Sequence, residues 1–304
     1  MLRIGSRGSK LALWQAEWVK TKLLKRFPTL EIAIRVIKTS GDTPDVPISK
    51  GAFTKQLQDA ILRNEIDLAV HSLKDVPTEI HECLQLTAIT KREEPCDALV
   101  CAVQGLKLAD LPPGSKVGTS SLRRKTQLLK LRPDLRVEEL RGNVDTRLRK
   151  LDSGDYDAII LAAAGLYRLG LQERISELLS PEVMIPAAGQ GALAIETRRD
   201  DEQTQCYVRT LNHKQTQIAC QAERAFLAAL GGGCRVPVAA YAYIDSSGLH
   251  LRGCVASLDG RELIKRSICG SPEDCEILGR KLAEKLLASG ADRLILEAKR
   301  ILKN

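Results

Sequence analysis

Two spacings of apolar residues alternate along the first part of the chain. A short strand-like segment at 3–5 precedes apolar residues three or four positions apart, which share one face of a helix: Ala12, Ala16, Val19, Leu23 and Phe27. Ser9 is placed to cap this helix, and Pro28 ends it. The alternating, β-branched stretch 32–38 predicts the next strand. This β-α-β opening predicts a mostly parallel sheet.

The alternation continues and then starts again. We expect a helix at about 53–64 and a strand at 67–71, and residues 91–96 form a candidate hinge. A second series follows, with strands expected at 97–103, 116–118, 135–140 and 156–161 and helices at 122–131, 143–151 and 166–169. The repetition predicts two similar α/β lobes around a cleft. The strand-like stretch 193–197 is expected to cross back to the first lobe.

The last third has a different order of elements. A helix at about 216–230 is followed by strands at 238–244, 249–255 and 262–269, a helix at 274–288 and a short segment near 294–301. Hairpin turns between these strands predict a small α+β domain. The predicted domains are 1–91 with 190–210 as lobe 1, 95–187 as lobe 2, and 214–304 as the C-terminal domain.

The amino-acid composition limits the classes of molecule that this protein is expected to bind. The chain has 304 residues, 44% of them apolar and 28% charged, which is typical of a globular protein. A formal net charge of +8 favours acidic partners, but only 3% of the residues are aromatic, which disfavours nucleic acid and leaves a small polyanion. The amino-terminal stretch has the pattern of neither a signal peptide nor a membrane span, so we expect a cytoplasmic protein.

The nine cysteines are scattered, with no C-x-x-C and no zinc-ligand spacing. An odd count without an export signal indicates reduced thiols, and we expect no metal site.

Three glycines precede Cys234, directly after the helix expected at 216–230. One glycine is enough to end a helix, whereas three let the backbone come close to another group. The cysteine is then either an inert residue after a helix cap, or a thiol presented as a nucleophile or attachment point. In the second case Arg224 and Arg235 would favour the thiolate.

Polar residues follow the strands expected at 3–5 and 67–71. Loops at the carboxyl ends of strands bind ligands in open α/β sheets, and 6–9 and 72–75 are such loops. Asp75 is either a turn former or a carboxylate that stabilises a cationic intermediate. We expect His71 to be a hydrogen-bonded strand residue and not a ligand.

Arginines gather at strand ends in the second series. Arg123 and Arg124 occupy the first turn of a helix, where cations oppose the helix dipole at about 0.3–1 kcal/mol each. An anionic ligand would offset that cost, and guanidinium groups bind carboxylates in a bidentate fork. Arg141, Arg147 and Arg168 also follow strands, although each arginine taken alone could be a solvated surface residue.

Four motifs together resemble the hydroxymethylbilane synthase family, also called the porphobilinogen deaminases: VHSLKDVP at 70–77, GTSSLRR at 118–124, LRGNVDTRL at 140–148 and GGCRVP at 232–237. They occur in order over nearly the whole chain. The resemblance implies a transferase of tetrapyrrole (porphyrin and heme) biosynthesis. It would join four porphobilinogen molecules head to tail with loss of ammonia and release hydroxymethylbilane by hydrolysis. The implied fold is two periplasmic-binding-protein-like (type II) lobes plus the small C-terminal α+β domain.

The resemblance also implies residue roles. Cys234 would hold a dipyrromethane cofactor through a thioether, and Asp75 would be the catalytic carboxylate. The implied cofactor contacts are Lys74, Asp75, Ser120, Arg123, Arg124 and Arg141. The implied contacts to substrate carboxylates are Arg7, Ser9, Arg141, Arg147 and Arg168, and the candidate lid residues are Phe53, Lys50 and Lys55.

Some positions depart from the family pattern. The loop before Phe53 is shorter and less glycine-rich than in many members, Gly231 stands where an acidic residue is common, and Cys96 stands where an arginine is frequent. The expected partners are porphobilinogen and the growing pyrrole chain, without nucleic acid or membrane, and the expected state is a monomer. The alternative function is a non-catalytic two-lobe anion-binding protein, which would leave the Gly-Cys loop unexplained.

Overall fold

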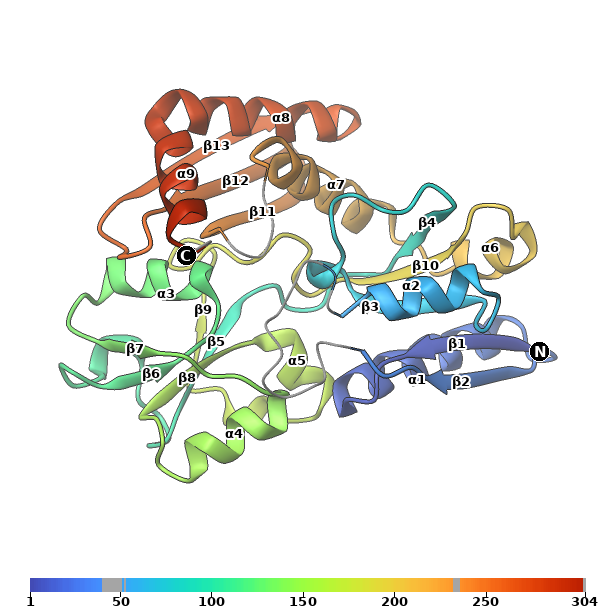
Figure 1. Ribbon diagram of the computed structural model, residues 1–304, viewed down its shortest axis with the longest axis horizontal. Coiled ribbons are helices and arrows are strands. Elements are labelled where there is room, and N and C mark those ends of the chain that lie inside the picture. Colours follow the sequence, from blue (N-terminus) through green and yellow to red (C-terminus); the bar gives the residue numbers. More distant parts are fainter. Residues whose placement is uncertain (40–50, 52, 232–235, 303–304) are drawn as a thin grey trace. The chain divides into compact units, whose positions relative to one another are not determined.

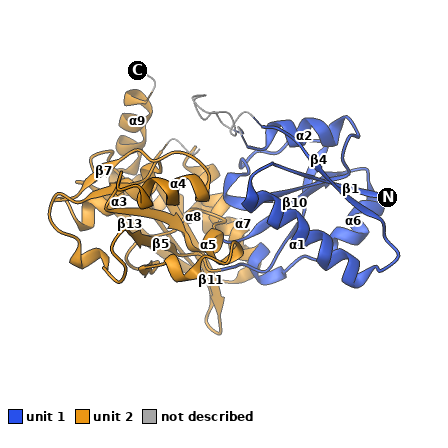
Figure 2. Cartoon of the chain, turned by 90° about the horizontal axis from the view of Figure 1, so that it is seen from below, with its two compact units in different colours: residues 1–93, 191–217 blue, residues 94–190, 218–304 orange. Residues whose placement is uncertain are grey.

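The chain folds into two compact units, residues 1–93 with 191–217 and residues 94–190 with 218–304 (Figure 2). The structure, a computed structural model, describes residues 1–39, 51, 53–231 and 236–302. The chain passes between the units at Glu93–Glu94, inside the candidate hinge 91–96, at Gln190–Gly191 and at Gln217–Ile218.

The first unit is built on a five-stranded sheet of order β2-β1-β3-β10-β4. Its strands are β1 (Leu2–Ser6), β2 (Ile32–Val36), β3 (Leu68–Ser72), β4 (Leu84–Ile89) and β10 (Leu193–Arg198). β1 runs parallel to β2 and β3, whereas β10 is antiparallel to both β3 and β4. The expected return of 193–197 to the first lobe is confirmed. The expectation of a mostly parallel sheet holds for four of the five strands, since β4 is antiparallel to β10 and therefore runs in the same direction as β1, β2 and β3. β10 is the exception, because it enters from the other unit and not through a crossover helix that would make it parallel.

Helices cover both faces of this sheet. They are α1 (Lys10–Arg26), α2 (Lys55–Leu62) and α6 (Glu202–Arg209). Leu68 and Val70 of β3 share a core with α1 and α6, whereas Ala69 between them shares another core with α2. Successive strand residues point to opposite faces, so the apolar run in β3 reflects burial on both sides (Figure 1).

The second unit begins with a sheet of the same plan, in the order β7-β6-β8-β5-β9. Its strands are β5 (Asp97–Cys101), β6 (Lys116–Gly118), β7 (Arg136–Glu138), β8 (Ala158–Ala162) and β9 (Glu177–Leu179). Its helices are α3 (Leu122–Leu131), α4 (Val144–Asp152) and α5 (Ala163–Arg168). β6 is parallel to β7 and β8, and β5 is antiparallel to β8 and β9, as in the first sheet. The prediction of two similar α/β lobes is therefore confirmed.

The C-terminal part is a three-stranded antiparallel sheet packed with helices (Figure 1). Its elements are α7 (Lys214–Ala229), β11 (Val238–Asp245), β12 (Gly248–Ala256), β13 (Leu263–Gly270), α8 (Cys275–Leu286) and α9 (Asp292–Ile301). A Cβ atom at Gly253 of β12 would lie 2.5 Å from the Phe226 ring of α7, so this glycine permits close helix–sheet packing. These elements confirm the predicted α+β domain.

Candidate active site

The loops after β1 and β3 leave the same edge of the first sheet, because the two strands are parallel neighbours. Ser9 caps α1, and its Oγ accepts a hydrogen bond from the Ala12 N–H at 3.3 Å. Arg7, also in the first loop, is half-buried, with its guanidinium carbon 4.2 Å from the centroid of the Phe53 ring. The structure thus brings together a predicted substrate-binding residue and a candidate lid residue.

Asp75 ends a short 3₁₀ helix, Leu73–Asp75, that follows β3 directly. The helix is held at its first residue: the Leu73 side chain is 1% exposed, and its N–H donates to the Ala192 carbonyl at 3.0 Å. Lys74 and Asp75 are both half-buried. Their backbone is therefore fixed by the core, while their side chains keep access to solvent.

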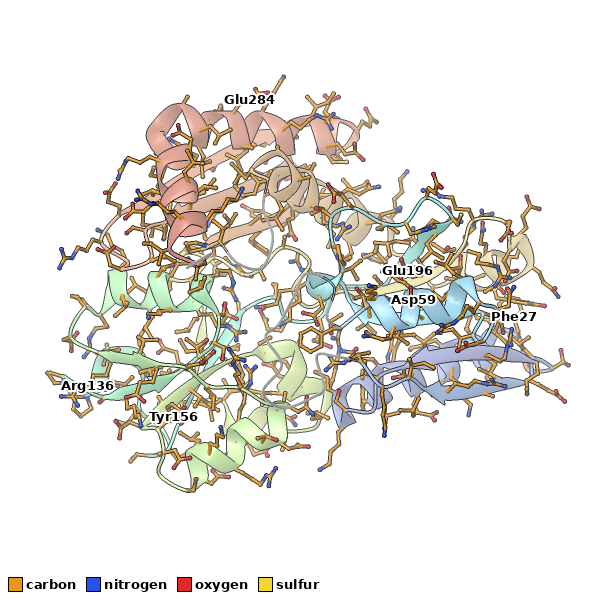
Figure 3. The ribbon with its side chains drawn as sticks, in the orientation of Figure 1. Phe27, Asp59, Arg136, Tyr156, Glu196 and Glu284 are labelled. Carbon is orange, nitrogen blue, oxygen red and sulfur yellow. The ribbon has the colours of Figure 1, made fainter. Side chains whose placement is uncertain are left out.

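His71 forms a buried hydrogen bond with Glu196. Its Nε2 lies 3.1 Å from Oε2 of Glu196, and the other oxygen of Glu196 accepts from Gln58 Nε2 at 2.9 Å. Glu196 lies on β10 beside α2 (Figure 3). The prediction of a hydrogen-bonded strand histidine is confirmed.

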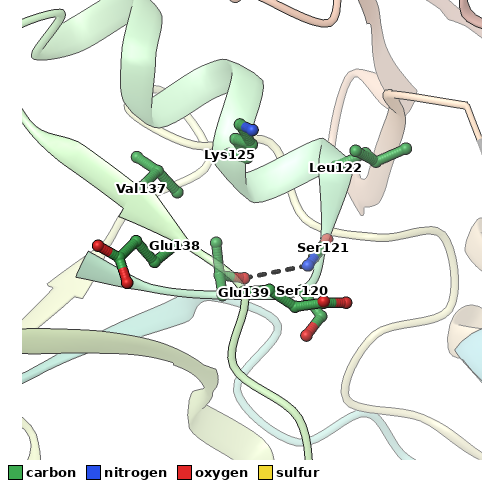
Figure 4. Close-up of a pocket in the computed structure, with 8 residues that line it drawn as sticks. Ser120, Ser121, Leu122, Lys125, Val137, Glu138 and Glu139 are labelled. Atoms are coloured by element: carbon green, nitrogen blue, oxygen red, sulfur yellow. Dashed lines mark hydrogen bonds between the residues drawn. The ribbon is translucent and has the colours of Figure 1, made fainter. Parts of the chain in front are cut away.

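Ser120 lies in the turn between β6 and α3. Its hydroxyl donates to the Leu140 carbonyl at 2.6 Å, and Ser121 caps α3 through its side chain. A hollow of about 190 Å³ opens beside this turn, with Glu138 and Glu139 forming part of its wall (Figure 4). The hollow therefore combines serine hydroxyl groups with the carboxylates of two glutamates. These negative charges disfavour binding of an anionic ligand close to them.

Arg123 and Arg124 share one buried carboxylate, that of Asp97. Arg123 contacts both oxygens, with Nη1–Oδ2 at 2.6 Å and Nη2–Oδ1 at 3.1 Å, and Arg124 Nε donates to Oδ1 at 2.9 Å. Burial alone would raise the pKa of the Asp97 carboxyl, but the two arginines outweigh it and hold that pKa well below its usual range. Asp97 therefore offsets part of the repulsion between these arginines and the helix dipole. The sequence alone predicts that this compensation comes only from an anionic ligand.

The other three predicted arginines differ in exposure. Arg141 is exposed and its Nε donates to Glu139 at 2.7 Å. Arg147 is half-buried and donates from Nε to the Gly142 carbonyl at 2.7 Å. Arg168, the last residue of α5, is 8% exposed.

Two of the predicted site residues, Lys50 and Cys234, lie outside the described residues. Lys55 is the exposed first residue of α2. Within the described ranges, no group of three or more His, Cys, Asp or Glu residues could hold a metal ion. None of the helices in those ranges is both long enough and apolar enough to span a bilayer.

Two residues of this site were missed from the sequence, Asp97 and Gln190. Gln190 Nε2 donates to Asp97 Oδ1 at 2.9 Å and to the Pro95 carbonyl at 2.8 Å. One available signal was a charged residue at the start of the otherwise apolar strand β5. A buried carboxylate requires a partner of opposite charge, and Arg123 and Arg124 are already candidate site residues from the sequence.

Two family models match the chain in order. "Porphobilinogen deaminase, dipyromethane cofactor binding domain" matches residues 2–206, and "Porphobilinogen deaminase, C-terminal domain" matches residues 217–288. Among curated relatives, the porphobilinogen deaminase of Geobacter metallireducens is 52% identical over 301 residues, covering 97% of this chain and 94% of the relative. That of Chlorobium chlorochromatii is 49% identical over 308 residues, covering 98% of each chain.

A solved structure, the nutrient binding protein from Burkholderia cenocepacia bound to methionine, covers 69% of this chain and 89% of its own. The TM-score is 0.44 and the sequence identity 15%. The full-length matches to the deaminases are far stronger, and they include both the lobes and the C-terminal domain. The chain belongs to the porphobilinogen deaminase family.

Proposed function

We propose that this chain is a hydroxymethylbilane synthase, a transferase that joins four porphobilinogen molecules head to tail with loss of ammonia and then releases the linear tetrapyrrole by hydrolysis. The observation that carries the proposal is the match to deaminases at about half identity over almost the whole chain. A non-catalytic anion-binding protein would not account for a match that extends through the C-terminal domain to residue 288.

The described residues fit a dipyrromethane cofactor by the chemistry of their donors. Such a group carries several carboxylates, and the turn at Ser120 leads directly into the arginine pair of α3. Cys234 is the proposed attachment point, through a thioether. When bound, the cofactor supplies the pyrrole carbon to which the first substrate is joined.

Asp75 is the proposed catalytic residue. A carboxylate beside the reacting ring stabilises the positive charge that develops as ammonia departs, and it can accept hydrogen bonds from pyrrole N–H groups. The short helix Leu73–Asp75 supports this role, because its anchored first residue limits movement of Asp75. Lys74 is the proposed neighbouring contact to a carboxylate of the cofactor.

The proposed carboxylate contacts are Arg7 and Ser9 in the first unit and Arg123, Arg124, Arg141, Arg147 and Arg168 in the second. Each added ring brings two carboxylates, so the growing chain is a polyanion, and the protein has a formal net charge of +8. At an effective dielectric near 20, one close arginine–carboxylate contact has a gross Coulomb energy of about 4 kcal/mol before desolvation. Phe53, Lys50 and Lys55 are proposed to cover the substrate, with Phe53 in contact with Arg7.

The test is the mass of the intact purified protein together with turnover of porphobilinogen. We expect a mass above that of the bare sequence by two linked pyrroles, and its loss in Cys234→Ser. A bare-sequence mass in a fully active wild-type protein would contradict the covalent cofactor. Wild-type protein without turnover of porphobilinogen would instead contradict the activity.

We also propose that the protein is monomeric and acts in the cytoplasm without nucleic-acid partners. The scarcity of aromatic residues supports the last point. Light scattering on a sizing column measures the oligomeric state, and a dimer at micromolar concentration would contradict the proposal.

The three-domain division into 1–91 with 190–210, 95–187 and 214–304 is likewise proposed. The two family models meet between residues 206 and 217, near the proposed start of the last domain. Limited proteolysis that releases a stable fragment beginning close to residue 214 would support this boundary, whereas first cuts inside α7 would contradict it.

A further inference from the structure

The Asp97 carboxylate is the meeting point of three side chains. It is 0% exposed and accepts hydrogen bonds from Arg123, Arg124 and Gln190. All of these residues belong to the second unit. A buried carboxylate of this kind fixes the orientation of the side chains that donate to it. A donor that turned away would lose its hydrogen-bond acceptor in a low-dielectric interior, which is energetically costly.

A second contact fixes each guanidinium plane. Arg123 Nη1 also donates to the Ile185 carbonyl at 2.8 Å, and Arg124 Nη1 donates to the Ile160 carbonyl at 3.0 Å. A guanidinium carries five N–H donors, so the contacts with Asp97 and one carbonyl oxygen leave donors on both arginines for another anion. Their exposed fractions are 7% and 5%, so little conformational freedom is left to lose when an anion binds.

Asp97 also sets the charge of this group. Two guanidinium ions side by side repel each other, and one buried carboxylate offsets one of the two charges. One positive charge is left uncompensated for the carboxylate of a ligand. The pair is thus oriented and partly neutralised before any ligand arrives.

Gln190 links this carboxylate to two of the three segments through which the chain passes between the units. Its Nε2 donates to Asp97 Oδ1 and to the carbonyl of Pro95. Pro95 follows the entry at Glu93–Glu94, and Gln190 is the last residue before the exit. The orientation of Asp97 therefore depends on the backbone of these two connecting segments.

We propose that Asp97 is a positioning residue of this enzyme: it directs Arg123 and Arg124 toward the carboxylates of bound pyrroles, and Gln190 holds the Asp97 carboxylate in place from the connecting segments. The inference rests on the proposed function of the arginine pair. It adds that substrate affinity depends on two buried residues that do not themselves touch the substrate.

The experiment compares Asp97→Asn, Asp97→Glu and Gln190→Met with the matched control Asp67→Asn. Asp67 also holds an arginine at two points, with Oδ1 2.6 Å from Arg3 Nη2 and Oδ2 3.1 Å from Arg3 Nε. It precedes β3, whereas Asp75 follows it. For each protein we would measure the thermal midpoint, the fraction carrying the cofactor by intact mass, and kcat and KM for porphobilinogen of the loaded fraction.

We expect Asp97→Asn to lower kcat/KM of the loaded, folded protein about 100-fold, with much of the change in KM, because misplacement of a binding group by about 1 Å has effects of this size. Asp97→Glu should recover part of that loss, since it restores the charge. Gln190→Met should raise KM about 3- to 10-fold, since it removes a hydrogen bond to a charged group without removing the charge. Asp67→Asn should lower the thermal midpoint and leave kcat and KM of the folded protein unchanged.

Wild-type kcat and KM in folded Asp97→Asn would overturn the proposal and leave Asp97 a stabilising residue only. If Asp97→Asn fails to fold, an unchanged KM in both Gln190→Met and Asp97→Glu overturns it. The turnover of porphobilinogen by the wild-type protein is measured first. A wild-type protein without this turnover would refute the proposed function itself, independently of any variant.

Discussion

The guanidinium of Arg7 lies over the ring of Phe53, with its central carbon 4.2 Å from the ring centroid. Such a cation–π contact contributes about 0.5–1 kcal/mol at partly exposed sites. If Arg7 binds a substrate carboxylate, the ring helps to hold the guanidinium in place. Phe53→Leu should then raise KM for porphobilinogen about two- to fivefold, because 1.36 kcal/mol corresponds to a factor of ten.

Phe53→Tyr is the matched control, since it keeps an aromatic face for Arg7. Steady-state kinetics should give it a KM close to wild type. A KM that rises equally in both variants would show that the ring acts through something other than the contact with Arg7.

Asp75→Asn tests the proposed catalytic carboxylate. The change is nearly isosteric at a half-buried position, so the thermal midpoint should stay close to wild type. Loss of the negative charge should lower kcat about 10²- to 10⁴-fold, the usual range for a group that acts on the transition state. Asp59→Asn, at another half-buried aspartate of the same unit, should leave kcat unchanged. Near-normal turnover by Asp75→Asn would remove Asp75 from the mechanism.

Local signals predicted much of the fold. The bounds of α3 match the expected 122–131, because the Ser121 cap and the apolar spacing are both encoded within that segment. The plan of two lobes also followed from a pattern repeated along the chain. The strand expected at 97–103 instead ends at Cys101, and the one expected at 135–140 spans only Arg136–Glu138.

Features that depend on the path of the chain were not predicted. The direction of β10 is set by its entry from the other unit, and nothing within 193–198 encodes it. The pairing of Asp97 with Arg123 joins residues 26 positions apart, and it requires the packing of β5 beside α3 to be known. β9 has only three residues, too few for an alternating pattern to be recognised.

Gly191→Ala tests the close approach of the two connecting segments within the first unit. Gly191 has φ of +92°, and an added Cβ would lie 2.4 Å from the Glu93 carbonyl oxygen. The positive φ alone costs about 1–3 kcal/mol for another residue, and the clash with backbone adds to it. The matched control is Gly170→Ala, where φ is +69° and no atom lies within 4 Å of the added Cβ. Thermal unfolding should show the larger loss for Gly191→Ala, and equal losses would contradict the close approach.

Thiol chemistry tests the proposed attachment site independently of activity. Among the cysteines that the structure describes, Cys83, Cys206 and Cys269 are exposed. Burial raises the pKa of Cys254 to about 12, so this thiol stays protonated and unreactive in the folded protein. Iodoacetamide should therefore label the exposed thiols of the folded protein first.

After unfolding, eight of the nine cysteines should be labelled, since a thioether at Cys234 leaves no thiol there. In Cys234→Ser, every remaining cysteine should react. Peptide mapping that finds labelled Cys234 in the active wild-type protein would contradict the thioether.

The stability of the protein in acid should depend on Asp97. Burial would raise the pKa of its carboxyl, but Arg123 and Arg124 depress it below the value of about 3.9 expected in the unfolded chain. A carboxyl with a lowered pKa in the folded state stabilises the fold above the unfolded pKa, and that contribution is lost as the pH falls through the folded pKa. At neutral pH, Asp97→Asn should cost about 3–5 kcal/mol, because it leaves buried arginines without their counter-charge. The difference in thermal midpoint between wild type and Asp97→Asn should therefore be largest above about pH 4 and shrink toward pH 3, because the Asp97 carboxyl of the unfolded chain takes up a proton in this range while that of the folded protein stays charged. A difference that stays constant from pH 7 to pH 3 would show that the charge of Asp97 does not stabilise the fold.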